Sequence, residues 1–385
     1  MKIAYIYQQF TQASGTERVF IDKMNYFAER QGYEVMMVTC QQGRHPIIFP
    51  VSPKIKHYDL GVRWANLYRY NRVYRFFKQI SLNRFFRKRF NQLMYETKPD
   101  IVICATYYLY IVTAVAKCKL NFSRVLESHI DLRYLFGFNT DNKKLQNGLY
   151  ELFGSDLLKK DAVKFDVLVA LNQSDADDWG RYLETRVILN LVHLNPTNRY
   201  CDYNSKRVIF VGRYVEQKGI FDLLEIWKRI HLVHPEWQLD MYGSGELQEK
   251  LTEEVRRLDA NIYLNNQTQN IFEKYLESSI LVLTSYYEPF GLVMPEAMSC
   301  GLPVVSFDCP SGPSYIITDK KDGFLVKSRD IDLYVKRLSE LMDSSDLRCK
   351  MGHNARMSSQ RFMGNNIMPQ WEQLFRELLE KSRNE

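Results

Sequence analysis

Short apolar runs alternate with amphipathic stretches along the whole chain. Runs of three to five mostly apolar residues are typical of strands buried in a parallel sheet, and helical periodicity fills most of the gaps between them. The runs cover 3–7, 35–39, 101–105, 167–171 and 187–191, and then 207–211, 239–242, 262–264, 280–283, 303–307 and 323–326. This order predicts an α/β protein built on parallel sheets.

The pattern also indicates two domains. A chain of 385 residues is long enough for two domains of ordinary size. The polar, turn-forming stretch at 195–198 interrupts the strand pattern, which begins again at 207, so we expect a linker within 192–205. The tail from Met368 has apolar residues at helical spacing and predicts an amphipathic helix, with a dimer contact as one possible use.

Composition places the chain among ordinary soluble globular proteins, with 45% apolar and 25% charged residues. No signal-peptide pattern opens the sequence, and no apolar run is long enough to span a bilayer. The seven cysteines are scattered and show no metal-binding spacing. We therefore expect a cytoplasmic protein, with a peripheral position on the inner face of the cell membrane as a further option.

The net charge of +7 is concentrated in one stretch. Residues 69–90 contain eight basic side chains and no acidic one, interleaved with aromatic residues. Such a surface suits an anionic membrane. The alternative is a solvated helix whose aromatic side chains pack inward. Nucleic acid could also bind this basic surface, but no nucleic-acid-binding motif accompanies it, so we expect no nucleic-acid partner.

The segment 284–308 carries the densest pattern of functional residue types. Glu288 follows one predicted strand, Glu296 opens a short helix, and Gly301 ends that helix before the next strand. Ligands of open α/β sheets bind beyond the carboxyl ends of strands, where helix N-termini point. We therefore expect a polar, phosphorylated ligand here, although a first-turn Glu can also serve only to offset the helix dipole.

Three strings within this segment resemble the signature of the family 4 (group 1) retaining nucleotide-sugar glycosyltransferases. They are Glu288-Pro289-Phe290-Gly291, Pro295-Glu296-Ala297-Met298 and Cys300-Gly301-Leu302-Pro303-Val304-Val305. The resemblance implies a GT-B fold, in which two Rossmann-like domains with doubly wound parallel sheets face each other across a cleft. Residues 1–195 would bind the acceptor, 196–365 would bind the nucleotide sugar, and the helix in 366–385 would return to the N-terminal domain.

A basic loop supplies a second site signal. Arg213 and Lys218 lie at opposite ends of the short loop between a predicted strand and helix, so both could converge on one point above the sheet. Two cations with backbone N–H groups can hold a diphosphate. The Gly212-Arg213 and Lys218-Gly219 pairs also match the diphosphate-binding loop of the family.

Two features of the N-terminal half match the family less fully. The loop after the first strand reads Ser14-Gly15-Thr16-Glu17-Arg18 where the family usually has GGxER, so Gly15 is the candidate for close approach to a ligand. His129 follows a predicted strand, and a structural histidine is the alternative to a proton handler. The resemblance implies that His129 faces the donor sugar, with Asp131 a looser candidate.

The resemblance assigns the remaining roles. Glu296 would accept the ribose hydroxyls, Glu288 would bind hydroxyls of the donor sugar, and the loop at Asn265 would read the nucleobase through its backbone. The donor-site candidates are Gly15, Gly212, Arg213, Lys218, Asn265, Glu288, Phe290, Gly291, Leu292, Val293 and Glu296. The catalytic candidates are His129, Glu288, Arg213 and Lys218.

The expected activity is transfer of a hexosyl or N-acetylhexosaminyl group from a UDP-sugar, without a metal or cofactor, to a glycan or a polyprenyl-diphosphate-linked acceptor. The product would belong to a cell-surface polysaccharide such as a capsule or lipopolysaccharide. The Asp175-Ala176-Asp177 triplet is interpreted as a helix cap with Ser174 rather than a cation site. Alternatives are a UDP-sugar 2-epimerase-like enzyme of the same fold, and an inactive homologue that binds sugar or membrane.

Overall fold

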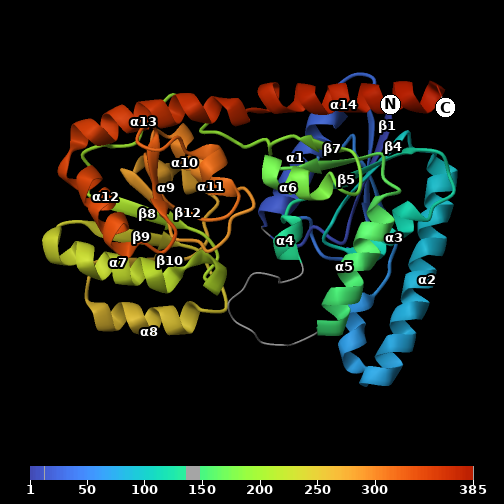
Figure 1. Cartoon of the computed structure of the whole chain (residues 1–385), viewed down its shortest axis with the longest axis horizontal. Helices are drawn as coiled ribbons and strands as arrows, with labels where there is room; N and C mark the ends of the chain where they lie inside the picture. Colours follow the sequence, from blue (N-terminus) through green and yellow to red (C-terminus); the bar gives the residue numbers. More distant parts are fainter. Residues whose placement is uncertain (13, 136–147, 385) are drawn as a thin grey trace. The chain divides into compact units, whose positions relative to one another are not determined.

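The computed structural model describes residues 1–12, 14–135 and 148–384, and these form two compact units (Figure 1). The N-terminal unit comprises Met1–Leu191 together with Gly364–Glu385, and the C-terminal unit comprises Val192–Met363. Sequence reasoning placed the corresponding boundaries after residues 195 and 365. Each unit is built on its own parallel sheet, as the apolar runs predict.

The N-terminal unit contains a seven-stranded sheet in the order β3-β2-β1-β4-β5-β6-β7. Its strands are β1 (Lys2–Tyr7), β2 (Glu34–Thr39), β3 (Lys56–Asp59), β4 (Ile101–Ala105), β5 (Ser123–Glu127), β6 (Val167–Ala170) and β7 (Thr185–Val187). All neighbouring pairs are parallel. The central strands are buried on both faces, which explains why they appear in the sequence as continuous apolar runs.

Helices cover both faces of this sheet. They are α1 (Gly15–Ala28), η1 (Trp64–Arg69), α2 (Arg72–Thr97), α3 (Leu109–Ala116), α4 (Leu132–Leu135), α5 (Gly148–Ala162), α6 (Gln173–Trp179) and α14 (Gly364–Asn384). Side chains of α2, α3, α5 and α6 share one hydrophobic core with the sheet. The C-terminal helix α14 packs on α1 and β5 instead, where the Phe375 and Phe27 rings lie 5.2 Å apart (Figure 1).

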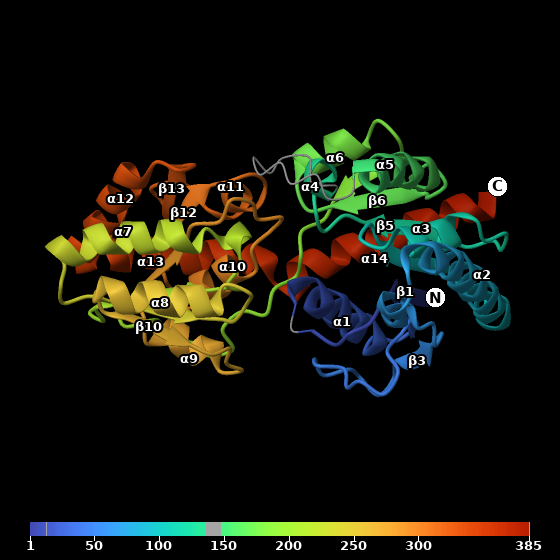
Figure 2. The same ribbon diagram turned by 90° about the horizontal axis from the view of Figure 1, so that it is seen from below.

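The C-terminal unit contains a six-stranded sheet in the order β10-β9-β8-β11-β12-β13. Its strands are β8 (Arg207–Val211), β9 (Gln238–Tyr242), β10 (Ile262–Asn265), β11 (Ile280–Leu283), β12 (Val304–Asp308) and β13 (Gly323–Lys327). Its helices are η2 (Glu216–Lys218), α7 (Ile220–Val233), α8 (Gln248–Leu258), α9 (Ile271–Leu276), α10 (Val293–Ser299), α11 (Gly312–Ile316), α12 (Ile331–Asp343), α13 (Ser345–Ser359) and η3 (Gln360–Phe362). Helices α7 and α8 lie side by side (Figure 2).

Both sheets are doubly wound. In the C-terminal sheet the chain moves outward from β8 to β9 and β10, then crosses back to β11 and continues outward on the other side. The carboxyl ends of β8 and β11 therefore flank a topological switch point, where open α/β sheets bind ligands. The equivalent point in the N-terminal sheet lies between β1 and β4.

Two local predictions were wrong. None of the predicted strands lies within residues 41–63, which we expect to be irregular from the lack of an apolar run, yet Lys56–Asp59 forms the edge strand β3 beside β2. As an edge strand, β3 is paired along one long side only. Its four residues, KHYD, are exposed or partly buried, so the sequence is polar and shows no apolar run. The strand predicted at 187–191 lies earlier in the chain than expected, since β7 covers Thr185–Val187.

Candidate active site

The switch point of the C-terminal unit brings a lysine and a glutamate together. Lys218 ends the short helix η2, and its ammonium forms an ion pair with Glu288 Oε1. The hydroxyl of Ser285 donates to the same oxygen at 2.7 Å. The Glu288 side chain is 4% exposed and that of Lys218 is 15% exposed, so the pair is nearly buried and the Lys218 side chain keeps some access to solvent.

The two loops that carry this pair are joined by hydrogen bonds. Thr284 Oγ1 donates to the carbonyl of Gly219 at 2.9 Å, and Gln217 Nε2 donates to the carbonyl of Tyr287 at 2.9 Å. Gly219 has a positive φ of 60°, and a Cβ atom there would lie 2.0 Å from Thr284 O. Only glycine permits this approach, so the Lys218-Gly219 pair of the sequence has a structural reason as well as a chemical one.

A residue that sequence reasoning missed supports the second loop. Arg329 Nη2 donates to the carbonyls of Thr284 and Ser285 at 2.8 and 2.7 Å, and its Nη1 pairs with Asp222. Its guanidinium lies over the ring of Tyr286 at 4.0 Å. Arg329 follows β13, far along the chain from its partners, and no local pattern marks it.

Arg213, just after β8, and Asn265, at the end of β10, lie at the carboxyl ends of strands separated by β9, and neither joins the ion pair. The Arg213 side chain is exposed and forms no ion pair within the described part of the chain. Gly212 N donates to Tyr242 O, and Gly243 N donates to Asn265 O, so the ends of β8, β9 and β10 are linked in a row. A Cβ atom on Gly243 would lie 1.9 Å from Gly212 O, which shows how closely these loops approach.

The turn between β11 and α10 carries the remaining candidates. Gly291 has φ 86°, and a Cβ atom there would lie 3.8 Å from Glu288 Oε2. The Phe290 side chain is buried and packs against Phe362, so only its backbone can serve a ligand. Leu292 and Val293 are partly exposed. Glu296 is buried in the first turn of α10, where the Tyr275 hydroxyl donates to its Oε2 at 3.4 Å.

In the N-terminal unit, Gly15 begins α1 at the end of the β1 loop. Ser14, which replaces a glycine of the family pattern, is the N-cap of this helix: its backbone is extended, and its hydroxyl accepts from Glu17 N at 3.3 Å. The Glu17 carboxylate turns back to accept from Gln12 N at 3.0 Å. Serine therefore fits this position, which explains the departure from the family pattern.

His129 follows β5 and is buried in the N-terminal unit. Its Nε2 lies 2.9 Å from Glu127 Oε2, and its ring stacks on that of Tyr107. The backbone carbonyl of His129 accepts from the Tyr107 hydroxyl at 3.4 Å. Asp131 is also buried and accepts from Asn172 Nδ2. His129 belongs to the N-terminal unit and the Lys218–Glu288 pair to the C-terminal unit.

The DxD triplet divides between two roles. Asp175 is buried and accepts from Leu132 N at 2.8 Å, whereas Asp177 is exposed and accepts from Gln173 Nε2. The predicted capping role of Ser174 was wrong, because Asn172 is the N-cap of α6. Among the described residues, no group of three His, Cys, Asp or Glu side chains could hold a metal ion.

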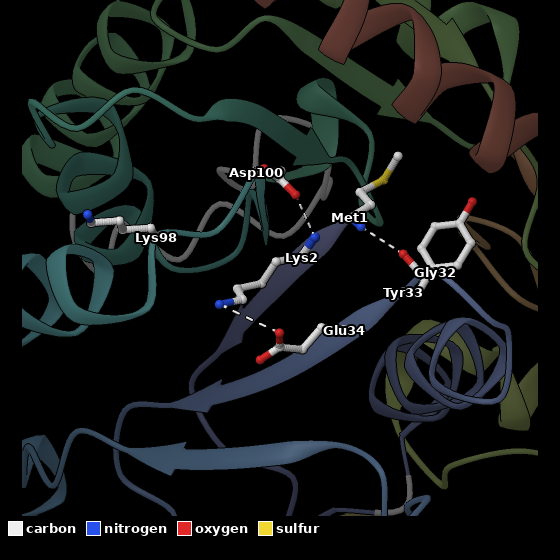
Figure 3. Close-up of a pocket in the computed structure, with 7 residues that line it drawn as sticks. All are labelled: Met1, Lys2, Gly32, Tyr33, Glu34, Lys98 and Asp100. Atoms are coloured by element: carbon white, nitrogen blue, oxygen red, sulfur yellow. Dashed lines mark hydrogen bonds and ion pairs between the residues drawn. The ribbon is translucent and has the colours of Figure 1, made fainter.

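A shallow hollow opens at the amino ends of strands in the N-terminal sheet, opposite their carboxyl ends (Figure 3). The amino group of Met1 donates to Gly32 O at 2.7 Å, and Lys2 N donates to Asp100 Oδ2 at 2.6 Å. Lys2 Nζ lies 3.6 Å from Glu34 Oε2. The hollow lies at the amino ends of β1 and β2 and its polar groups bond one another, so we do not assign it to the site.

Residues 202–358, most of the C-terminal unit, match the family described as Glycosyl transferases group 1. The C-terminal unit is a group 1 glycosyltransferase domain. The predicted family is therefore confirmed, and the chain is a glycosyltransferase.

Individual glycosyltransferases resemble it over different lengths. An uncharacterized glycosyltransferase of Haemophilus influenzae is 28% identical over 96% of this chain and 98% of that protein. The amylovoran biosynthesis glycosyltransferase AmsD of Erwinia amylovora is 33% identical over 46% of this chain and about half (51%) of its own length. The crystal structure of S. aureus TarM in complex with fondaparinux, alpha-GlcNAc-glycerol and UDP is 15% identical, with a TM-score of 0.77 over 97% of this chain and 99% of that chain. The predicted GT-B fold of this glycosyltransferase is confirmed.

We predict that Gly219→Ala destabilises the C-terminal unit much more than Gly32→Ala destabilises the N-terminal one. Both glycines have positive φ, so both variants carry a conformational cost of about 1–2 kcal/mol. Gly32 has nothing within 4 Å of an added Cβ, whereas Gly219 meets the Thr284 carbonyl. Calorimetry of each variant beside the wild type measures the two costs. Equal costs would contradict the close loop contact.

The pKa of Glu17 gives a second prediction. Burial raises this pKa from 4.5 to about 7, so the folded chain binds the proton more tightly than the unfolded chain. Stability is therefore lost as the pH rises from 4.5 to about 7. Glu17→Gln removes this loss, so its stability relative to wild type should increase across that window by at most about 3 kcal/mol. Urea unfolding at several pH values tests the trend, and a constant difference would refute it.

Proposed function

We propose that this glycosyltransferase moves a hexosyl or N-acetylhexosaminyl group from a UDP-sugar to a hydroxyl of a glycan or polyprenyl-diphosphate-linked acceptor, with retention of the anomeric configuration. The observation that carries the proposal is the Lys218–Glu288 ion pair at the switch point of the C-terminal sheet. It sets a cation suited to phosphate beside a carboxylate suited to sugar hydroxyls, at the sheet edge where ligands bind.

The cation would act on the leaving group. Cleavage of the glycosidic bond to phosphate leaves negative charge on the diphosphate, and Lys218 with Arg213 at the other end of the loop would stabilise it. Fixed donors in a largely dry site can each contribute about 3–4 kcal/mol of transition-state stabilisation. The Lys218 ammonium is already held by Glu288 on a loop that Gly219 and Thr284 fix, so little reorganisation is needed.

The carboxylates would hold the donor. Glu288 Oε1 already accepts from Lys218 and Ser285, so its Oε2, toward Gly291, is the oxygen available to sugar hydroxyls. Glu296 would accept the ribose hydroxyls, and backbone N–H groups of 290–293 would contact sugar and phosphate. We propose attack from the face of the departing phosphate, which takes the proton of the acceptor hydroxyl. The two cations supply the charge neutralisation, so the proposal requires no metal.

Two relatives support the choice of substrates. TarM was solved with UDP and alpha-GlcNAc-glycerol, which favours a UDP donor and an α-linked product. AmsD acts in amylovoran biosynthesis, which favours a polysaccharide as the destination.

Purified wild type, Lys218→Gln, Glu288→Ala and Arg213→Ala should be compared on a panel of UDP- and GDP-sugars. We expect nucleotide release from at least one UDP-sugar by the wild type, with kcat reduced about 100-fold or more in Lys218→Gln because a transition-state contact is lost. Arg257→Gln on α8 is the control, because its ion pairs with Glu253 and Glu254 lie on the surface. Equal release from all variants would refute the residue assignment.

The product distinguishes the alternatives. Mass spectrometry should show a glycosylated acceptor whose anomeric configuration matches that of the donor. A released epimerised sugar would favour the 2-epimerase. Thermal stabilisation by UDP-sugars without turnover on any acceptor would favour a binding protein that has lost its activity.

We also propose that the first turns of α2 contact an anionic membrane. The aromatic residues of 69–90 divide into two groups: Phe86 and Phe90 are buried, whereas Phe76 and Phe77 are 62% and 63% exposed. The side chains of Tyr68 and Arg72 lie outside the described residues. Exposed apolar rings flanked by cations suit a surface of anionic lipids. The described helices include none long and apolar enough to span a membrane.

The membrane contact predicts sedimentation with vesicles. Wild type should bind phosphatidylglycerol-containing vesicles more than phosphatidylcholine vesicles, and added salt should weaken this binding. Phe76→Ser with Phe77→Ser should reduce binding several-fold because two apolar anchors are lost. Tyr95→Ser is the matched control, since Tyr95 is 67% exposed near the other end of α2. Equal binding by all three proteins would refute the contact.

A further inference from the structure

A second lysine–glutamate pair is buried in the N-terminal unit beside His129. Lys23 from α1 and Glu127 at the end of β5 form an ion pair, with side chains that are 2% and 3% exposed. Glu127 Oε2, the oxygen that pairs with Lys23, also accepts from His129 Nε2 at 2.9 Å. The other oxygen, Oε1, is buried without a hydrogen-bond partner among the described residues. One carboxylate oxygen therefore holds both the lysine and the histidine.

Aromatic rings enclose the Lys23 ammonium. It lies 5.0 Å from the ring centroid of Phe20 and 4.3 Å from that of Trp371 on the C-terminal helix α14. Such cation–π contacts stabilise an ammonium group that is removed from water. A buried ion pair is weak evidence for stability, because apolar residues of similar volume often do as well. The arrangement of the Lys23–Glu127 pair around His129 therefore points to a role in fixing that histidine.

The bonding fixes the form of the imidazole. Burial opposes ionisation of Glu127, but Lys23 and His129 outweigh it and lower its pKa, so Glu127 is a carboxylate that only accepts. Burial lowers the pKa of His129, so the ring is neutral. Nε2 must then carry the proton that is donated to Glu127. Nδ1 is left as the ring's acceptor.

We propose that Lys23, held by Trp371 of α14, is a positioning residue: it secures Glu127, which in turn keeps His129 in the Nε2–H form with Nδ1 ready to accept a hydrogen bond from a sugar hydroxyl. The inference rests on the proposed function for the sugar, but the form of the ring can be measured without any substrate. Lys23 and Trp371 touch neither sugar nor phosphate and act through His129.

Among the residues that the structure describes, few other ionisable groups surround this cluster. Tyr5 on β1 and Cys104 on β4 face Glu127, and burial raises the pKa of both, so both are neutral at pH 7. The Tyr107 ring stacks on His129, and its hydroxyl lies 3.1 Å from Thr16 Oγ1. The charge on Lys23 thus opposes protonation of His129, and the charge on Glu127 favours it. Removal of Lys23 should therefore raise the pKa of His129.

The first experiment is nitrogen-15 NMR of the histidine rings in the full-length protein without substrate, with His129→Gln used to assign the signal. We expect wild-type His129 to be neutral at pH 7 with Nε2 protonated. Lys23→Met should move its titration to higher pH. Trp371→Leu keeps both charges but removes a ring from the ammonium, so it should shift the titration in the same direction by less.

Kinetics provide the second readout, with a UDP-sugar from which the wild type releases nucleotide in the panel described under the proposed function. Lys23→Met should lower kcat about tenfold or more at pH 7, with donor KM changed less than about twofold, and activity should recover at higher pH as His129 loses its proton. A merely structural defect would not recover with pH. If Lys23→Met fails to fold, Lys23→Met with Glu127→Gln leaves no buried charge, and His129 should then populate both tautomers because an amide can donate or accept.

Glu372→Gln is the matched control. Glu372 also joins α14 to α1, because its Oε1 accepts from the Tyr26 hydroxyl of α1 and pairs with Arg30 just after α1, each at 3.5 Å. It lies outside the Lys23 cluster, so its variant should titrate and turn over like wild type. An Nδ1–H form of His129 in the wild type, or unchanged titration in both Lys23→Met and Trp371→Leu, would overturn the proposal. The expected tautomer without turnover on any donor would instead refute the proposed function and leave the positioning role standing.

Discussion

The ion pair between Lys218 and Glu288 constrains the C-terminal unit more than any other contact in its site. Two nearly buried charges are tolerated only if each stays within reach of the other, because either one alone would face a large desolvation penalty. The two loops that carry them must therefore hold a fixed separation. Gly219 in a left-handed conformation, the hydroxyl of Thr284 and the guanidinium of Arg329 all serve that requirement.

Each unit of this glycosyltransferase holds one such pair, but the two differ in access. Lys23 and Glu127 are sealed beneath aromatic rings, so their charges can act only through a neighbour. The Lys218 side chain is 15% exposed, and its ammonium could exchange its carboxylate partner for phosphate oxygens without leaving its loop. Exposure, rather than residue type, thus separates a group suited to direct contact with substrate from one suited to positioning another residue.

Sequence reasoning recovered the elements whose signal is local. Strands buried on both faces appear as apolar runs, and the double-glutamate segment is contiguous, so both could be found without coordinates. Lys23 and Arg329 could not, since each cation meets its partners only after distant parts of the chain fold together. Edge strand β3 was not predicted for a different reason: its polar sequence carries no burial pattern. The roles assigned to the candidate site residues, including Lys218, Glu288 and His129, remain predictions.

The basic, aromatic stretch shows why composition alone could not decide between a core helix and a surface helix. The aromatic side chains of α2 divide between its two parts: the rings of Phe86 and Phe90 complete the hydrophobic core, and those of Phe76 and Phe77 face solvent. The cations are spread over both parts, so charge does not mark the division. What marks it is contact with the sheet and with Tyr110, whose ring meets Phe86 at 5.5 Å. The last turns of α2 are fixed by the core, and its first turns are free of that constraint, so apolar rings there need an explanation outside the core.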